Sequence, residues 1–442
     1  MRIKINNFGT VSEADVAIGG LTVITGENDT GKSTIGKILF SMVKAISRYE
    51  EDIEEDKEEK ITSLVEKTFF NLRRRINITE HPEIRDLFNP RKFYAYLKTD
   101  PIKTIRERES YIRNLMYKNG LSELVADAVC SDLERIYEIV SEPDDEISAI
   151  NRALRKAFYS EFRGEITQKG HQTPVKASLE VVDGASPLID IKWSRDGMTE
   201  FQYTDGLGYN DATYVDSPSV MQFHNLVRYA KSLFDNNGEA GRLTVPLHVK
   251  DLSNKLSDSV YSLFFHADLF SDGSFFNETL RISKKINSTF KGEVAYDTES
   301  NDFYLEKQGY KIASGNIASG IKSLGMLDML IKSGAVAENS LLIVDEPEVN
   351  LHPKWQVLYA ELICELVSLG VDIIITTHSP YIIDALKHYS DKYEVNNQFY
   401  LTERFPNEDY TYFIDITHNV AHAINLLATP LRELNQEYLD DF

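Results

Sequence analysis

Four short stretches of the sequence carry residues whose types and spacing suit phosphate and metal chemistry. The first, GENDTGKST, has a glycine, four residues and then Gly-Lys-Ser, which is the spacing of a phosphate-binding loop. Backbone N–H groups of such a loop converge on phosphate oxygens, Lys32 would reach the β- and γ-phosphates, and the Ser33 hydroxyl would hold Mg²⁺. The predicted phosphate-binding residues are Gly26, Glu27, Asn28, Asp29, Thr30, Gly31, Lys32, Ser33 and Thr34.

The second stretch, LLIVDEPEVNLHP, places two acids directly after four apolar residues. In open α/β sheets, ligands bind at the carboxyl ends of the strands, where these acids would lie. Asp345 would support Mg²⁺ directly or through water, and Glu346 would polarise the attacking water. The alternative is a strand that ends in two solvated acids. The phosphate loop elsewhere in the chain favours the catalytic interpretation.

The third stretch, VDIIITTHSP, is another apolar run that ends in polar residues. His378 would lie at the same edge of the sheet, where its ring could hydrogen-bond a γ-phosphate. A lone histidine after a strand is commonly a satisfied polar residue with no catalytic role. Its position after the Asp-Glu pair favours a functional role, so Glu346 and His378 are the candidate catalytic residues.

A fourth stretch, ASGIKSLGML, could form a second anion site. Ser319 and Gly320 open an amphipathic helical pattern, which provides a hydroxyl and a helix N-terminus. Because the chain already has a phosphate loop, a second cradle suits a nucleotide held by another subunit. The nearby ASGN at residues 313–316 is an alternative placement.

The hydrophobic pattern predicts the elements that must position these residues. Residues 1–25 read as strands and 31–48 as a helix, so a strand and a helix flank the phosphate loop. From residue 319 onward, apolar strands alternate with helices, which indicates a parallel sheet covered on both faces. The predicted fold class is therefore α/β.

The middle of the chain has a different pattern. The acidic run Glu50–Lys60 is either a solvated helix face or a loop, and a helical pattern continues to about residue 165. Residues 174–204 alternate with period two and contain Asp-Gly turns, which predicts a β-meander. Beyond it we expect a strand at ATYVD, helices near 217–236 and at 249–270, and a hairpin at 291–313. The predicted domains are an α/β core at 1–45 and 205–390, a helical insertion at 46–165, a β-meander subdomain at 166–204 and a C-terminal α/β extension at 391–442.

Composition restricts the classes of function. The chain has 442 residues, with 48 Lys and Arg against 69 Asp and Glu, a formal net charge of −21. Such a chain is a poor candidate for indiscriminate nucleic-acid binding, because neutralising phosphates supplies most of that affinity. No apolar run is long enough for a membrane span, and the two cysteines are far apart, so we expect a cytoplasmic protein with reduced thiols.

Together the motifs resemble those of the ABC-type ATPase heads of the Rad50/SMC/RecF and OLD-like class. GENDTGKST resembles the Walker A motif, SGIKS the signature motif, LLIVDEP the Walker B motif and TTHSP the switch-histidine region. EVNLHP lies where that class has its D-loop, with His352 in place of the aspartate of transporter ATPases. The resemblance covers about residues 1–45 and 205–385. It implies a P-loop head with a mixed or parallel sheet, an antiparallel β-subdomain and a helical insertion.

The resemblance also implies ATP and Mg²⁺ as cofactors. Two heads would sandwich two ATP molecules, with Ser319 acting on the nucleotide of the partner head. Phe8 is either a contact of the adenine or a core aromatic residue. The implied metal ligands are Ser33, Asp345 and a Q-loop residue, for which Gln222 in SPSVMQF is the candidate and Ser217 an alternative.

A narrower similarity is to stand-alone ATPases of bacterial anti-phage systems of the Septu, retron-associated or PARIS type. No carboxylate-rich nuclease-like region follows the last motif, so we expect a separate effector. An ATP-dependent homodimer of heads, or a higher oligomer, would control a nuclease or toxin encoded nearby, respond to DNA or a phage-derived trigger, and hydrolyse ATP slowly. The alternative is a DNA repair or recombination ATPase of the RecF or Rad50 type, which the acidic composition disfavours. A transporter subunit is disfavoured by the long insertion.

Overall fold

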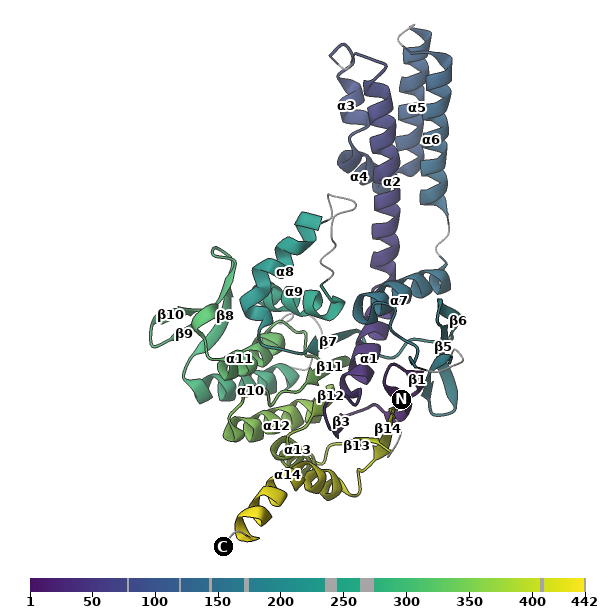
Figure 1. Cartoon of the computed structure of the whole chain (residues 1–442). Coiled ribbons are helices and arrows are strands. Elements are labelled where there is room, and N and C mark those ends of the chain that lie inside the picture. Colours follow the sequence, from purple (N-terminus) through teal and green to yellow (C-terminus); the bar gives the residue numbers. More distant parts are fainter. Residues whose placement is uncertain are drawn as a thin grey trace. The chain divides into compact units, whose positions relative to one another are not determined.

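The structure is a computed structural model, and it describes residues 1–77, 79–118, 121–142, 145–170, 175–234, 245–262, 274–405 and 409–440. The chain divides into two compact units. The sheet unit consists of Met1–Ser47 and Leu154–Phe442, and the helical unit of Arg48–Ala153. The predicted insertion at 46–165 extends beyond this second unit, because the boundary between the units, after Ala153, falls within helix α7 (Glu146–Phe162). Figure 1 labels the elements of both units.

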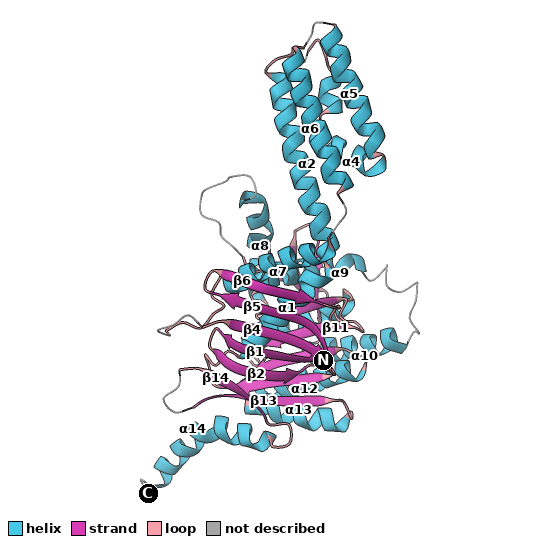
Figure 2. Cartoon of the chain, turned by 90° about the vertical axis from the view of Figure 1, so that its right-hand side faces the viewer, coloured by secondary structure: helices cyan, strands magenta, loops and turns pink. Residues whose placement is uncertain are grey.

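The sheet unit is built around one large mixed sheet (Figure 2). Among the described residues it has eleven strands in the order β6-β5-β4-β1-β2-β14-β13-β3-β12-β11-β7. In that order the strands are Gly197–Tyr203, Ser186–Ser194, Ala177–Asp183, Arg2–Phe8, Val11–Ala17, Thr411–Asp415, Asn397–Arg404, Leu21–Gly26, Asp372–Thr377, Ser340–Asp345 and Asp211–Val215.

The strands that carry the candidate motifs form the parallel part of this sheet. β3 pairs in parallel with β12 and β13, and β11 pairs in parallel with β12 and β7. Their sequences are almost continuously apolar, because helices cover both faces of the sheet and bury every second residue on each side. The carboxyl ends of β3, β11 and β12, at Gly26, Asp345 and Thr377, therefore lie at one edge of the sheet.

The two flanking segments of the predicted domain map are continuous with this sheet. The β-meander, now β4 to β6, extends the main sheet because β4 pairs with β1. The C-terminal segment supplies β13 and β14, and β13 pairs directly with the phosphate-loop strand β3. Both segments are therefore integral parts of the main sheet. In particular, β13 and β14 join its antiparallel half to its parallel half.

Helices and a small second sheet complete the sheet unit. The predicted helix at 249–270 is α9, which is described as far as Ser262, and residues 263–273 lie outside the described residues. The predicted hairpin at 291–313 is the three-stranded sheet β8 (Glu293–Asp297), β9 (Asp302–Lys307) and β10 (Tyr310–Ala313). The remaining helices are α1 (Lys32–Ser47), α8 (Val220–Phe234), α9 (Leu247–Ser262), α10 (Ser274–Phe290), α11 (Ser319–Lys332), α12 (Pro353–Ser368), α13 (Pro380–Lys392) and α14 (Val420–Asp440).

The helical unit has its own apolar core, to which residues from Ile61 to Ile136 contribute. The acidic run Glu50–Lys60 is helical and belongs to α2 (Tyr49–Arg73). Asn89 and Asp100 cap the next two long helices with their side chains, and a proline follows each cap at the first helical position. The other helices of this unit are α3 (Glu83–Leu87), α4 (Pro90–Thr99), α5 (Pro101–Tyr117) and α6 (Glu123–Ser141). Nowhere in the described ranges is a helix both long enough and apolar enough to cross a membrane.

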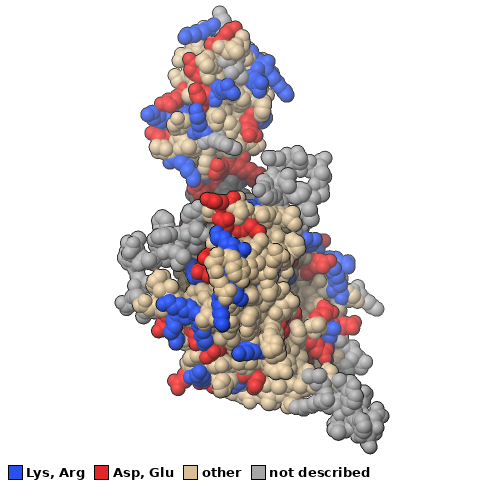
Figure 3. Space-filling view, turned by 90° about the vertical axis from the view of Figure 1, so that its left-hand side faces the viewer, with Lys and Arg blue, Asp and Glu red and all other residues tan. Residues whose placement is uncertain are grey.

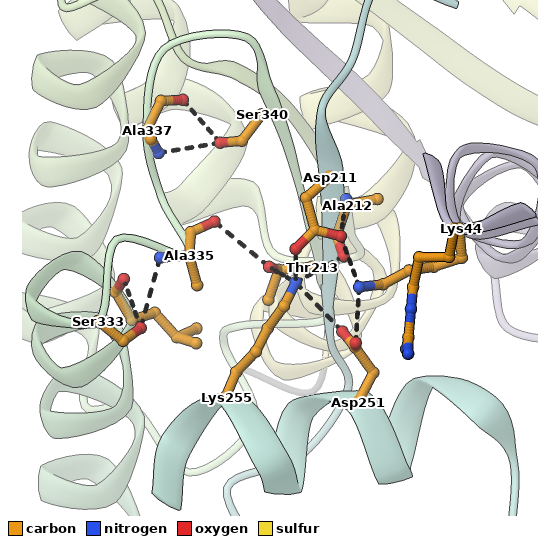
Figure 4. A network of polar contacts seen from close by, with 12 residues as sticks. Lys44, Asp211, Ala212, Thr213, Asp251, Lys255, Ser333, Ala335, Ala337 and Ser340 are labelled. Carbon is orange, nitrogen blue, oxygen red and sulfur yellow. Dashed lines mark hydrogen bonds and ion pairs between the residues drawn. The ribbon is translucent and has the colours of Figure 1, made fainter. Parts of the chain in front are cut away.

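A buried network of charges fixes the phosphate-loop helix to its neighbours (Figure 4). The Lys44 Nζ on α1 lies 2.5 Å from Asp211 Oδ1 on β7 and 2.6 Å from Asp251 Oδ1 on α9. Lys255, also on α9, reaches the same two carboxylates at 2.6 and 3.2 Å and donates to the Thr213 hydroxyl. The Lys44 side chain is only 7% exposed. Its charge is therefore compensated by carboxylates rather than by water.

Replacing Lys44 with methionine is expected to destabilise the sheet unit by about 2 kcal/mol, because the largely buried Asp251 and the partly exposed Asp211 would then share one lysine. Chemical denaturation followed by circular dichroism measures the change. The control is Lys192→Met, which breaks an exposed cross-strand pair with Glu200 and should leave the denaturation midpoint unchanged. Equal midpoints for the two variants would contradict this account.

Candidate nucleotide site

The phosphate loop connects β3 to α1 as the sequence predicts. Gly31 has φ +77°, and a Cβ there would approach Thr10 Oγ1 and Val11 Cγ2 to 2.8 Å, so glycine is required at this position. The Thr30 hydroxyl lies 2.8 Å from the Glu27 carbonyl oxygen and 2.6 Å from the Thr402 hydroxyl of β13. The loop is thus braced by its own backbone and by the C-terminal strand.

Lys32 is enclosed within this loop. Its residue is 4% exposed, and its Nζ donates to the Glu27 carbonyl oxygen at 2.6 Å. Burial lowers the pKa of this ammonium, and the carboxylates of Glu346 and Asp345 act in the opposite direction. A cation held by one carbonyl inside a loop of N–H groups is arranged to bind an anion.

Asp345 receives hydrogen bonds from three other segments of the chain. Ser33 Oγ donates to its Oδ1 at 2.8 Å, and Tyr214 Oη donates to its Oδ2 at 2.8 Å. The Thr376 hydroxyl also donates to Oδ1. Burial and the neighbouring Asp345 carboxylate raise the pKa of Tyr214 well above its ordinary value, so the phenol remains a donor. The two predicted metal ligands Ser33 and Asp345 are therefore in direct contact.

The two candidate catalytic residues are close to each other. His378 Nδ1 lies 3.6 Å from Glu346 Oε1, and it lies 3.2 Å from Oε1 of a further acid, Glu348. The Glu346 N–H donates to the Thr376 carbonyl oxygen, which holds the turn after β11 against β12. The structure thus brings Lys32, Ser33, Asp345, Glu346 and His378 to the same edge of the sheet.

A cavity of about 350 Å³ lies against the phosphate loop. Phe8 borders it but is 1% exposed, and its ring packs edge-on against Phe162 and Trp193. Phe8 is thus a core aromatic residue, which was one of the two interpretations offered by the sequence. The residues lining the cavity are Phe8, Gly9, Thr10, Asp29, Thr30, Gly31, Lys32, Ser33, Thr34, Phe162, Glu165 and Glu346.

The signature-like residues do not line this cavity. Ser319 is exposed in the first turn of α11, and Gly320 packs closely against Trp355 of α12. In the alternative stretch, Ser314 is buried and donates to Asp302 Oδ1 at 2.9 Å. That serine is committed to the fold, whereas Ser319 is available to a ligand or partner.

Gln222 is not brought to the metal ligands. It is exposed in the first turn of α8. The alternative Ser217 lines a small cavity of about 20 Å³ that Asp345 and Glu346 also border, as does the neighbouring Asp216. The structure therefore places the residues just after β7, and not Gln222, next to the Walker B acids.

Sequence reasoning missed several residues of this site. Tyr214 and Thr376 donate to Asp345, and Glu348 contacts His378. From β13, Thr402 braces the loop and the Arg404 guanidinium contacts Asp29. The acid in DEPEV is a local signal that could have pointed to Glu348, but nothing near the other residues in the sequence marks them as part of a site.

His248 connects the end of β7 to α7. Its Nδ1 lies 2.6 Å from Glu161 Oε2 and its Nε2 lies 3.4 Å from Asp216 Oδ2. Although burial opposes the charged ring, hydrogen bonds to these two carboxylates raise the pKa of His248 to about 9. The ring also packs against Tyr214 at 4.9 Å between centroids. A charged histidine thus supports the tyrosine that holds Asp345.

The residues at this edge fit a nucleotide with Mg²⁺. The glycine at position 31 cannot be replaced without a clash, Lys32 is buried with its Nζ on the Glu27 carbonyl oxygen, and Ser33 faces the Asp345 carboxylate. Lys32 and the loop N–H groups would hold phosphate oxygens, and Ser33 and Asp345 would hold the metal ion. Bound Mg²⁺ would neutralise charge on the phosphates.

These features define a P-loop ATPase with an ABC-type arrangement of motifs on an α/β sheet. A family model described as "AAA domain, putative AbiEii toxin, Type IV TA system" matches residues 134–384, more than half of the chain. A model described as "AAA ATPase domain" matches residues 1–174. The chain belongs to the first of these families. The predicted ATPase class is confirmed at the level of an AAA-type ATPase domain, and the mixed sheet with its helices confirms the predicted α/β fold class.

Solved structures with similar folds include heads of SMC proteins. The SMC head domain from Thermotoga maritima aligns over 94% of this chain and 97% of its own, at 9% identity and a TM-score of 0.38. A Smc head with an extended coiled coil, bound to the C-terminal domain of ScpA from Pyrococcus furiosus, aligns over 98% of both chains at 10% identity and a TM-score of 0.40. The family assignment rests on the family models and not on these distant likenesses. No curated protein sequence matches the chain.

The charged His248 predicts a pH-dependent stability. Because its folded pKa, about 9, lies above the unfolded value near 6.5, its contribution is fully present below pH 6.5 and is lost as the pH rises through 9. The loss is on the order of 3 kcal/mol. Urea denaturation at pH 6 and pH 9.5 measures it, with His248→Gln as the reference for groups that titrate elsewhere. A wild-type protein that loses no more stability than His248→Gln between these pH values would contradict the assignment.

Proposed function

We propose that this protein binds ATP with Mg²⁺ and hydrolyses it slowly at the edge of the sheet formed by β3, β11 and β12. The observation that carries the proposal is the direct Ser33–Asp345 contact beside Lys32 and Glu346. Lys32 and the loop bind the phosphates, Ser33 and Asp345 hold the metal, Glu346 polarises water and His378 contacts the γ-phosphate. Gln222 keeps its predicted role as metal ligand only if α8 moves, and the residues after β7 are better placed.

We propose further that two heads form a dimer around ATP, with Ser319 and Gly320 of one head completing the site of the other. The exposed position of Ser319, away from the cavity of its own chain, supports this arrangement. Val349, in the turn after the Walker B acids, is also an exposed apolar residue. Burial in a dimer would remove it from water.

The dimer would act as a switch that controls a separate effector, a nuclease or a toxin, in bacterial anti-phage defence. The family description, which refers to a toxin of a toxin–antitoxin system, supports a setting of this kind. The alternative, an ATPase acting on DNA in repair, needs a basic surface. On the face drawn in Figure 3, basic side chains are interspersed with acidic ones, and the net charge of the chain is −21. Both observations favour the switch.

The assigned roles predict different outcomes for two substitutions. Lys32→Ala should weaken ATP binding at least about tenfold, because it removes the buried cation of the loop. Glu346→Gln should retain binding and reduce hydrolysis by about 100-fold or more, because it removes the group that polarises water. Isothermal titration calorimetry and phosphate release measure the two effects, with the exposed Glu338→Gln as a control. Normal turnover by Glu346→Gln would show that the role given to Glu346 is wrong.

The switch predicts ATP-dependent assembly. Glu346→Gln should form dimers with ATP and monomers without it, as measured by mass photometry, and Ser319→Arg should prevent dimer formation without affecting ATP binding. Co-expression with the product of the adjacent gene should yield a stable complex. If ATP-dependent dimers do not bind that protein but bind DNA in a salt-sensitive way, the result would favour the repair function.

A further inference from the structure

Glu348 is a buried acid that the catalytic assignments leave without a role. It lies in the turn between β11 and α12, and its side chain is 6% exposed. Its Oε1 accepts hydrogen bonds from the Thr377 hydroxyl at 2.8 Å and from the His378 N–H at 2.7 Å. Its Oε2 has no hydrogen-bond partner within the described ranges. A buried carboxylate with one oxygen unsatisfied is costly unless a donor is provided.

The ring of His378, which lies beside Glu348, also has an unsatisfied atom. Its Nδ1 is buried and makes no hydrogen bond in the described part of the chain, although it lies 3.2 Å from Glu348 Oε1 and 3.6 Å from Glu346 Oε1. The His378 side chain as a whole is 40% exposed. One ring nitrogen thus lies between two carboxylates. Oε1 of Glu348 already accepts two hydrogen bonds, so the unsatisfied Oε2 of the same carboxyl group is the acceptor left for Nδ1–H after a small rotation of the ring.

The two acids differ in what they can offer this nitrogen. Glu348 is buried and fixed by two hydrogen bonds at the end of β12, so it is positioned before any ligand arrives. Glu346 is partly exposed and borders the cavity next to the phosphate loop. If Glu346 held Nδ1, it could not act on water. If Glu348 holds Nδ1, Glu346 remains free and the other ring nitrogen, Nε2, is available to the nucleotide.

We propose that Glu348 is a positioning residue that accepts a hydrogen bond from the Nδ1–H of His378 and thereby fixes the tautomer and orientation of the ring. A carboxylate can only accept, so the proton must reside on Nδ1. Buried partners of this kind commonly orient a functional histidine through its second nitrogen. The proposal deepens the proposed ATPase function and rests on it.

A purely structural role is the competing explanation, because Glu348 also ties the turn after β11 to β12. Glu348→Gln separates the two roles. The amide oxygen can still accept from Thr377 and from the His378 N–H, so the turn should be retained. The amide NH₂ then takes the place of Oε2, the acceptor left for the ring. Because it can only donate, it would favour a lone pair on Nδ1 and reverse the tautomer.

The first measurement is steady-state ATP hydrolysis. Glu348→Gln should lower kcat about tenfold or more, change KM less than about twofold and keep the melting temperature of the wild type. Glu338→Gln, the same substitution at an exposed site before β11, should match the wild type in all three quantities. In a His378→Gln background, Glu348→Gln should cause no further loss of kcat, because its effect passes through the ring.

The second measurement does not depend on turnover. The protein is labelled with ¹⁵N-histidine, and the Nδ1 signal of His378 is assigned by its absence in His378→Gln. In the wild type this signal should have the chemical shift of a protonated nitrogen. It should move to that of a nitrogen with a lone pair in Glu348→Gln. If the protein hydrolyses no ATP, the proposed function fails, and this spectrum still tests the contact. An unchanged Nδ1 signal, or a loss of kcat that persists in the His378→Gln background, would overturn the proposal.

Discussion

The Asp345 carboxylate is the point on which the geometry of the site depends. Its two oxygens accept hydrogen bonds from Ser33 on α1, Tyr214 on β7 and Thr376 on β12. These segments are distant in the chain and meet because β7, β11, β12 and β3 are adjacent and parallel, so all four end at one edge. A shift of one residue in any pairing would turn a donor to the opposite face of the sheet.

The same constraint explains what the sequence could and could not predict. Ser33 and Asp345 belong to motifs in which a local pattern, a glycine-rich loop or an apolar run ending in acids, already implies the chemistry. Tyr214 looks like any aromatic residue of a buried strand. Only the register of β7 on β11, in which Tyr214 is paired with Ile343, brings its side chain beside Asp345. Thr376 is likewise defined by its register partner, which is Asp345 itself. Such positions depend on strand register, which one sequence does not encode in any local signal.

The C-terminal strands show a second reason why one sequence does not predict the whole site. The pattern of residues 391–442 predicts strands and a helix but not their partners, so the segment looks like an extension. In the structure β13 lies beside β3, and Thr402 and Arg404 contact the phosphate loop. Pairing between strands separated by more than 370 residues in the chain is decided by the packing of the whole sheet. The same holds for Gln222, whose place after a strand suggested a metal ligand although the helix that carries it directs it to solvent.

Buried ionic groups around the site fix its geometry as well as contributing to stability. Ion pairs such as Lys44 with Asp211 and Asp251 gain little net free energy, since the cost of removing charges from water offsets much of their attraction. Their benefit is that they favour one packing of the elements, because any alternative packing that separates a buried charge from its partner is costly. Here the pairs fix α1 to β7 and α9, and His248 with Glu161 supports the ring of Tyr214.

The backbone conformation at Glu346 also reflects the geometry of the site. Glu346 has φ +49°, a conformation that costs a non-glycine residue about 1 kcal/mol or more. Its N–H donates to the Thr376 carbonyl oxygen at 3.0 Å and lies 3.2 Å from the hydroxyl that contacts Asp345. The turn is therefore held in an unfavourable conformation by β12, the strand that precedes His378. That conformation separates the roles of two successive acids: Asp345 remains within the sheet beside Ser33, while Glu346 borders the cavity. Glycine would adopt this backbone more readily, but it would supply no carboxylate. The strained backbone of Glu346 therefore supports the role proposed for its carboxylate.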